Sequence, residues 1–298
     1  MQDLIQVGAN TYYIDLNSKV GVYVPQPGEA ILIDSSNQEA AKKIEAILDE
    51  NHLNLRCILN THCHADHIGS NFALQERYKC PIYAQEVESY FINVPLMSAC
   101  FLYGGHPYKI MRHHLLAAKG SKCRPFEEAK LPEGFKFHLL SGHAMGMTAI
   151  STPDDIVFTG DIACGREVLE KYPISFYYDV GLYLQSLDLA RAIKGKLFIC
   201  AHADPVEDLN PLLDHNRKII EDIFTVIKEF CTDQPKSFEH IQREVFLRYN
   251  YGSKPNYMIF ANAGSAIRGH ISYLVDTRQL KTVIEDGFIK YITLSDKG

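Results

Sequence analysis

The feature that most constrains this chain is a dense run of histidines with one aspartate, directly after an apolar segment. Residues 56–59 read Arg-Cys-Ile-Leu, and residues 60–70 read Asn-Thr-His-Cys-His-Ala-Asp-His-Ile-Gly-Ser. Four potential metal ligands fall close together here: His62, His64, Asp66 and His67. A helical pattern follows from Gly69. The cluster is therefore predicted to lie on a strand-to-helix loop, where side chains can converge on an ion.

The residue types in this cluster favour some metals over others. Imidazoles with one carboxylate suit zinc, iron or manganese and do not suit calcium. In an extended segment His62 and His64 point the same way and Cys63 points away from them. Asp66 and His67, after a turn, can face a second ion. Chance clustering is the alternative, but so many histidines are costly to bury without a metal or other partners.

The spacing His62-x-His64-x-Asp66-His67 resembles the signature of the metallo-β-lactamase superfamily. That family places three more ligands downstream, each on a loop after a strand. The chain offers one in each place: His143, Asp161 and His202. The resemblance covers the organisation of roughly residues 1–213.

The resemblance implies a site for two divalent metal ions, with zinc the first expectation and iron or manganese the alternatives. It assigns the seven ligands as His62, His64 and His143 on one ion, Asp66, His67 and His202 on the other, and Asp161 between them. A metal-bridging hydroxide would attack the substrate, because such metals lower the pKa of bound water to about 7. Asp66 is also the candidate catalytic residue, which orients the nucleophile or shuttles its proton.

The residue at position 161 indicates which reaction to expect. Several β-lactamases of this fold place a cysteine there, whereas an aspartate resembles the thioesterase, lactonase and nuclease branches. We expect a hydrolase of a small ester, thioester or lactone, similar to glyoxalase II or a lactonase. Three alternatives remain: a nuclease, a mononuclear iron enzyme of the persulfide dioxygenase type, and a metal-stabilised protein with no catalytic activity.

Alternation of strand and helix patterns predicts an α/β protein. Together with the resemblance, it indicates a four-layer αβ/βα sandwich of two mixed sheets with a helical C-terminal region. The expected strands are 11–16, 20–24, 30–33, 56–60, 81–84, 135–140, 147–151, 156–159 and 196–200. The expected helices of this part are 38–51, 71–78, 85–91 and 178–194. Asp34, at a strand end, either caps the next helix or supports the metal loop.

We expect a catalytic domain over residues 1–213, with an insertion at 92–133 that either caps the metal cleft or only packs on the core. Residues 214–298 form the expected C-terminal region. Helical patterns at 212–230, 237–249 and 258–275, followed by a hairpin at 282–292, resemble a winged-helix module.

The composition indicates which binding partners and which cellular location to expect. The net charge is −6, and acidic residues outnumber basic ones in residues 201–298, which argues against a nucleic-acid partner. A small-molecule substrate is the expected partner. No apolar run approaches the roughly 18 residues of a membrane span. The eight cysteines are scattered, which is typical of buried thiols in the cytoplasm. Neither the substrate nor the oligomeric state follows from the sequence.

Overall fold

The computed structural model describes residues 3–251 and 256–294, and its larger sheet has seven strands. Their order in the sheet is their order in the chain, antiparallel from β1 to β4 and parallel from β4 to β7. The strands are β1 (Ile5–Gln6), β2 (Thr11–Ile14), β3 (Val20–Tyr23), β4 (Glu29–Ile33), β5 (Asn54–Leu59), β6 (Ile82–Ala84) and β7 (Cys123–Pro125).

The second sheet has four strands in the order β11-β10-β9-β8, with β10 and β11 parallel and the other pairs antiparallel. Its strands are β8 (Lys136–Leu139), β9 (Thr148–Ser151), β10 (Ile156–Gly160) and β11 (Leu197–Cys200). Side chains alternate between the two faces of a strand. Ile31 and Ile33 of β4 accordingly pack with Ile150 and Phe158 of the second sheet. The expected sandwich of two mixed sheets is confirmed.

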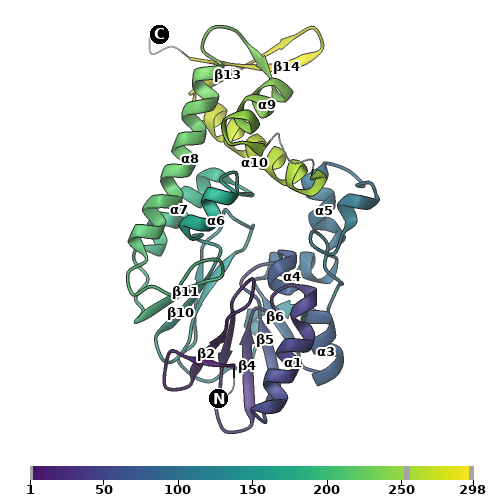
Figure 1. Ribbon diagram of the computed structural model, residues 1–298, viewed down its shortest axis with the longest axis vertical. Coiled ribbons are helices and arrows are strands. Elements are labelled where there is room, and N and C mark those ends of the chain that lie inside the picture. The colour runs from purple at the N-terminus through teal and green to yellow at the C-terminus, as the bar shows by residue number, and fades with distance from the viewer. Residues whose placement is uncertain (1–2, 252–255, 295–298) are drawn as a thin grey trace.

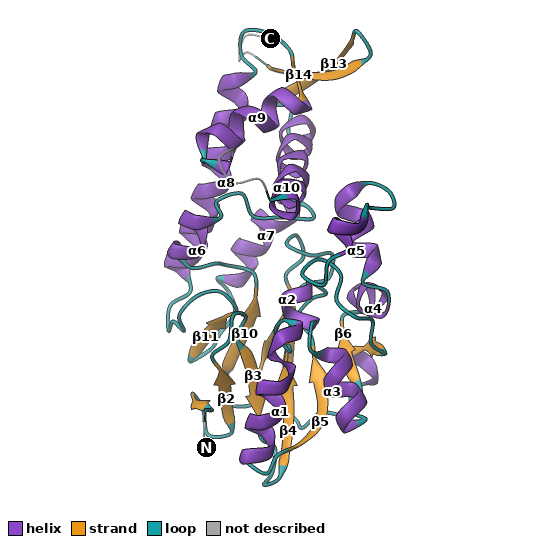
Figure 2. Cartoon of the chain, turned by 45° about the vertical axis from the view of Figure 1, so that its right-hand side comes forward, coloured by secondary structure: helices purple, strands orange, loops and turns teal. Residues whose placement is uncertain are grey.

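Helices cover the outer faces of both sheets. α1 (Ala41–Glu50), preceded by the 3-10 turn η1 (Gln38–Ala40), and α3 (Asn71–Tyr78) lie against β4 and β5 (Figure 2). α7 (Val180–Ala190) packs on the other sheet through Tyr183 and Leu187. The remaining helices of this part are α2 (Ala65–Ile68), α4 (Glu86–Asn93) and α6 (Arg166–Lys171). The four expected layers are therefore present.

The segment 92–133 contains α5 (Leu96–Tyr103), the turns η2 (Lys109–Arg112) and η3 (Phe126–Glu128), and strand β7. The sequence did not predict β7. This strand has only three residues, reads Cys-Arg-Pro without alternation, and lies at a sheet edge, where proline is tolerated.

The C-terminal part consists of α8 (Asn210–Phe230), α9 (Phe238–Arg248), α10 (Tyr257–Asp276) and a three-stranded sheet. The expected hairpin is β13 (Leu280–Glu285) with β14 (Phe288–Thr293), and the unexpected short strand β12 (Lys236–Ser237) pairs with β14. The boundary expected after residue 213 falls inside α8, which rises from the sandwich to the hairpin (Figure 1). α10 contacts α5 of the segment 92–133.

No helix in the described ranges, 3–251 and 256–294, is both long and apolar enough to cross a membrane.

Candidate metal centre

The loop after β5 presents the first ligand candidates. β5 ends at Leu59, and His62 and His64 follow in the loop. Asp66 and His67 lie in the one-turn helix α2, where the sequence had indicated only a turn. A short helix changes the direction of the side chains within a few residues. It therefore directs Nε2 of His67 toward Asp161, although the ring of His67 still lies against that of His62, with 4.0 Å between the ring centres.

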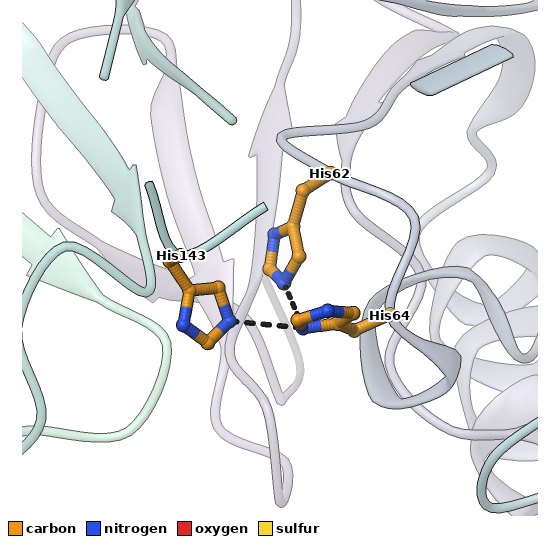
Figure 3. A group of neighbouring side chains, drawn as sticks. All are labelled: His62, His64 and His143. Carbon is orange, nitrogen blue, oxygen red and sulfur yellow. Dashed lines mark hydrogen bonds between the residues drawn. The ribbon is translucent and has the colours of Figure 1, made fainter. Parts of the chain in front are cut away.

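His62, His64 and His143 form the first group of potential ligands. One ring nitrogen from each lies within 4.8 Å of the others. Nδ1 of His64 is 3.1 Å from Nε2 of His62 and 2.9 Å from Nε2 of His143 (Figure 3). His62 is completely buried, and His143 nearly so. Three imidazole nitrogens that converge in a buried place form a suitable site for a transition metal ion.

Asp66, His67, Asp161 and His202 form the second group, again within 4.8 Å of one another. Nε2 of His202 is 3.0 Å from Oδ2 of Asp66, and Nε2 of His67 is 3.3 Å from Oδ1 of Asp161. The group thus combines two carboxylates with two imidazoles. This mixture of oxygen and nitrogen donors suits a divalent ion of the zinc, iron or manganese type.

Asp161 lies between the two groups. Its Oδ2 is 3.4 Å from Nε2 of His143 in the first group and 3.6 Å from Nε2 of His202 in the second. Its Oδ1 is buried and accepts no hydrogen bond of good geometry from the described residues, although Nε2 of His67 lies 3.3 Å away. A buried carboxylate oxygen without a donor is costly, and a cation at this position would remove the cost. The donor set therefore fits the metal pair that the resemblance implies, although the assignment of ligands to individual ions stays a prediction.

Two glycines allow the loops that carry His143 and Asp161 to pack closely against neighbouring elements. Gly142, directly before His143, has φ +128°, and a Cβ there would overlap the backbone of Tyr183 at the start of α7. Gly160, directly before Asp161, has φ +57° and lies against the side chain of Thr61 in the first ligand loop. Both glycines therefore bring a ligand loop into close contact with another element.

The structure resolves the two alternatives for Asp34. Its carboxylate accepts hydrogen bonds from the N–H and the hydroxyl of Thr61, both at 2.7 Å, and Oδ2 lies 2.8 Å from Nδ1 of His67. The capping interpretation is wrong, because Asn37 accepts the capping hydrogen bond from Ala40 instead. Since a carboxylate can only accept, Nδ1 of His67 donates to Asp34 and Nε2 is left to face a metal.

The sequence analysis missed Glu88 of α4. Its side chain is buried, Oε2 accepts from the N–H of Cys63 at 2.8 Å, and Oε1 accepts from the N–H of Gly146 at 2.6 Å. Glu88 thus connects the loop that carries His64 to the loop that carries His143. The available signal was its position one helical turn before the buried Ile92, on the apolar face of α4.

The two groups differ in their affinity for protons. Burial lowers the pKa of His62, of His64 and of His143, the last to about 3. Burial also acts against a charge on His67, but the carboxylates of Asp161, Asp66 and Asp34 outweigh it and raise the pKa of His67 well above its ordinary value. The first group is therefore ready to bind a cation at neutral pH, whereas in the second an ion would replace a proton.

Comparisons with known proteins agree with this geometry. The family model described as "Metallo-beta-lactamase superfamily" matches residues 13–202. The "Probable metallo-hydrolase YybB" of Bacillus subtilis is 28% identical over 158 residues, which are 51% of this chain and 66% of that protein. An uncharacterized protein of Mycobacterium tuberculosis, Rv2581c, is 28% identical over 163 residues, 49% of this chain and 68% of its own length.

Two solved structures have the fold of almost the whole chain. A beta-lactamase domain protein from Burkholderia ambifaria superposes with a TM-score of 0.72 and 17% identity, covering 98% of this chain and 93% of its own. The metallo-beta-lactamase family protein TTHA1429 from Thermus thermophilus superposes with a TM-score of 0.67 and 17% identity. The match covers 98% of this chain and 97% of that protein. At this identity the likeness shows the fold alone. It includes the C-terminal helices.

Proposed function

This chain belongs to the metallo-beta-lactamase superfamily, and from that premise we propose that it is a dinuclear metal-dependent hydrolase of a small ester, thioester or lactone. The observation that carries the proposal is the position of Asp161, within 3.4 Å of His143 in one group and 3.6 Å of His202 in the other. One carboxylate that contacts two converging sets of donors suits a pair of ions better than a single ion.

Two bound ions would supply hydroxide at neutral pH and stabilise negative charge on the substrate oxygen. The protein itself supplies an ionised carboxylate that can accept a hydrogen bond from the attacking water. Burial acts to raise the pKa of Asp66, but His67 and His202 outweigh it, so that the pKa lies below the usual range and the carboxylate is ionised. The side chain is also 37% exposed, toward a cavity above the site. Asp66 can therefore accept a hydrogen bond from a water in that cavity and orient it, and its alternative role as a proton shuttle stays a prediction.

We propose zinc as the metal, because five imidazoles and two carboxylates suit its preference for nitrogen and oxygen ligands. The branch follows from position 161, where this chain carries aspartate. This residue supports a glyoxalase II-like or lactonase-like enzyme over a β-lactamase. No observation within the described residues favours the nuclease or the iron dioxygenase.

We further propose that the segments outside the sandwich serve the substrate. Phe101 and Leu116 of the insertion 92–133 line the cavity above the metal centre, and so do Met258 and Asn262 of the region 214–298. This supports a catalytic domain, residues 1–213, whose insertion 92–133 closes the cleft together with the region 214–298, although α8 continues across the proposed boundary. The winged-helix interpretation of the C-terminal region rests on the succession α8, α9, α10 and hairpin. The proposal of a cytoplasmic location rests on the cysteine pattern alone.

The test is hydrolysis by zinc-loaded protein of a panel of short esters, thioesters and lactones. We expect turnover of at least one class, and its loss together with reduced metal content in His64→Ala and Asp161→Ala. Full activity in both variants would refute the site. No turnover of any class would refute the hydrolase.

A further inference from the structure

A cavity of about 500 Å³ opens directly above the metal centre. Four of the candidate ligands line its inner end: His64, Asp66, His143 and Asp161. A volume of this size accommodates a small organic molecule. The walls of this cavity therefore lie next to any substrate group that enters it on the way to the metal centre.

The walls are mainly aromatic and aliphatic. Phe176 lies edge-on to the ring of His64, with ring centres 5.9 Å apart, and Tyr177 lies 6.3 Å from the ring of His143. Leu102 of α5 and Met258 of α10 contribute from the two segments outside the sandwich. Such walls bind the apolar part of a ligand by removing it from water.

The cavity also lacks a basic partner for a charged ligand. Within the described ranges, no lysine or arginine lines it, and the one charged side chain apart from the candidate ligands is Glu88. Both oxygens of Glu88 already accept backbone hydrogen bonds, from Cys63 and Gly146. Among the described residues that line the cavity, a carboxylate or phosphate at the far end of the ligand would therefore find no counter-charge, which is strongly unfavourable.

We propose that this cavity binds a bulky, uncharged, apolar group on one side of the scissile bond. The inference rests on the proposed hydrolase and adds its substrate class: esters, thioesters or lactones with a chain of several carbons or a ring, and no acidic group at its far end. Phe101 and Tyr178, whose ring centres are 5.6 Å apart, are 46% and 37% exposed and form the rim through which this group enters.

The first experiment measures kcat/KM for two series on zinc-loaded protein, one from acetyl to hexanoyl thioesters and one from methyl to hexyl acetates. Burial of one methylene contributes about 0.8 kcal/mol, so kcat/KM is expected to rise about fourfold per carbon in one series. Hexanoyl is expected to be favoured at least tenfold over adipoyl, which adds a terminal carboxylate. Turnover without dependence on chain length, or a preference for adipoyl, would overturn the inference and leave the proposed hydrolase standing.

Two pairs of variants test the walls. Met258→Asp and Leu102→Asp place a carboxylate in the cavity from α10 and from α5, and are expected to remove the gain in kcat/KM with chain length. Their neighbours Tyr257 and Tyr103 do not line the cavity and are 62% and 49% exposed, so Tyr257→Asp and Tyr103→Asp are the matched controls. Wild-type chain-length dependence in both Met258→Asp and Leu102→Asp would contradict the assignment.

Binding of a neutral apolar fluorophore, N-phenyl-1-naphthylamine, to chelator-treated protein gives a readout without turnover. We expect about one site per chain, weakened at least tenfold in Met258→Asp and unchanged in Tyr257→Asp. If no substrate is cleaved but the probe binds in this way, the hydrolase proposal fails and the apolar cavity stands. Absence of binding, or equal binding by both variants, would overturn the cavity assignment.

Discussion

Oδ2 of Asp34 lies 2.8 Å from Nδ1 of His67, in a contact that is buried on both sides. This contact fixes the orientation of an imidazole whose other nitrogen faces Asp66 and Asp161. Asp34 has φ +61°, a left-handed conformation that aspartate and asparagine tolerate better than most residues. Position 34 therefore needs a residue that tolerates a left-handed backbone and that carries a negative charge toward His67.

The contact predicts the effect of Asp34→Asn, which keeps the backbone preference and removes the charge. Loss of such a supporting carboxylate typically weakens metal binding about 10- to 100-fold. We expect a loss of this size for one of two zinc ions, measured by competition with a chromophoric chelator. Asp15→Asn is the control, because Asp15 is 62% exposed and pairs only with Lys19 among the described residues. Equal zinc affinities in wild type and Asp34→Asn would contradict the supporting role.

Glu88 predicts a loss of stability together with a loss of metal. Glutamine offers one acceptor oxygen in place of two, so Glu88→Gln leaves one of the two buried N–H groups, of Cys63 or Gly146, without a partner. The expected decrease in the free energy of unfolding is about 1–3 kcal/mol, with weaker zinc binding at the histidine group. Urea unfolding and zinc titration measure the two effects. Glu86→Gln, an exposed position in the same helix, should change neither.

Gly142 predicts the effect of a single methyl group. In Gly142→Ala the added Cβ overlaps the backbone of Tyr183, and φ +128° is unfavourable for alanine. Backbone strain alone costs roughly 1–3 kcal/mol, and the loop that carries His143 must shift. We expect lower thermal stability and loss of one bound ion. Gly105→Ala, with no atom near the added Cβ, is the control. A Gly142→Ala variant that behaves like Gly105→Ala would show that the close approach is not required.

His270 of α10 predicts a pH dependence of stability away from the metal centre. Burial lowers its pKa to about 4 from the usual 6.5, although Nδ1 hydrogen-bonds the carbonyl of Ala266. As the pH falls below 6.5, His270 binds a proton in the unfolded chain but stays neutral in the folded chain. His270 therefore leaves the free energy of unfolding unchanged above pH 6.5 and decreases it as the pH falls toward 4.

His270→Leu should remove this dependence. Between about pH 7.5 and pH 5 the wild type should lose about 2 kcal/mol more than the variant. The measurement is chemical unfolding at both pH values in the presence of a chelator, so that the metal ligands contribute equally to both proteins. Parallel losses in the two proteins would show that His270 is protonated in the folded state.

The sequence sufficed for features that depend on local spacing. His62, His64, Asp66 and His67 stand in one short stretch, and the resemblance to a known family pointed to His143, Asp161 and His202, each of which comes shortly after a strand. Features that depend on long-range contacts were missed. Glu88 accepts hydrogen bonds from backbone groups 25 and 58 residues away in the sequence. Strand β7 is recognised only through its pairing with β6.

The cavity walls show the same limit. The aromatic run Phe176-Tyr177-Tyr178 resembles an ordinary core segment in the sequence, and only the packed structure brings it over the metal centre opposite α5. The proposed substrate selection therefore rests on residues that only the folded chain brings together.

The most direct test of a dinuclear site is the metal content of the purified protein at saturation, by elemental analysis together with protein quantification. The position of Asp161 between two groups of donors predicts about two divalent ions per chain, most of them zinc, and a loss of metal in Asp161→Ala. Saturation at one ion per chain, with full hydrolytic activity and no loss in Asp161→Ala, would contradict the account.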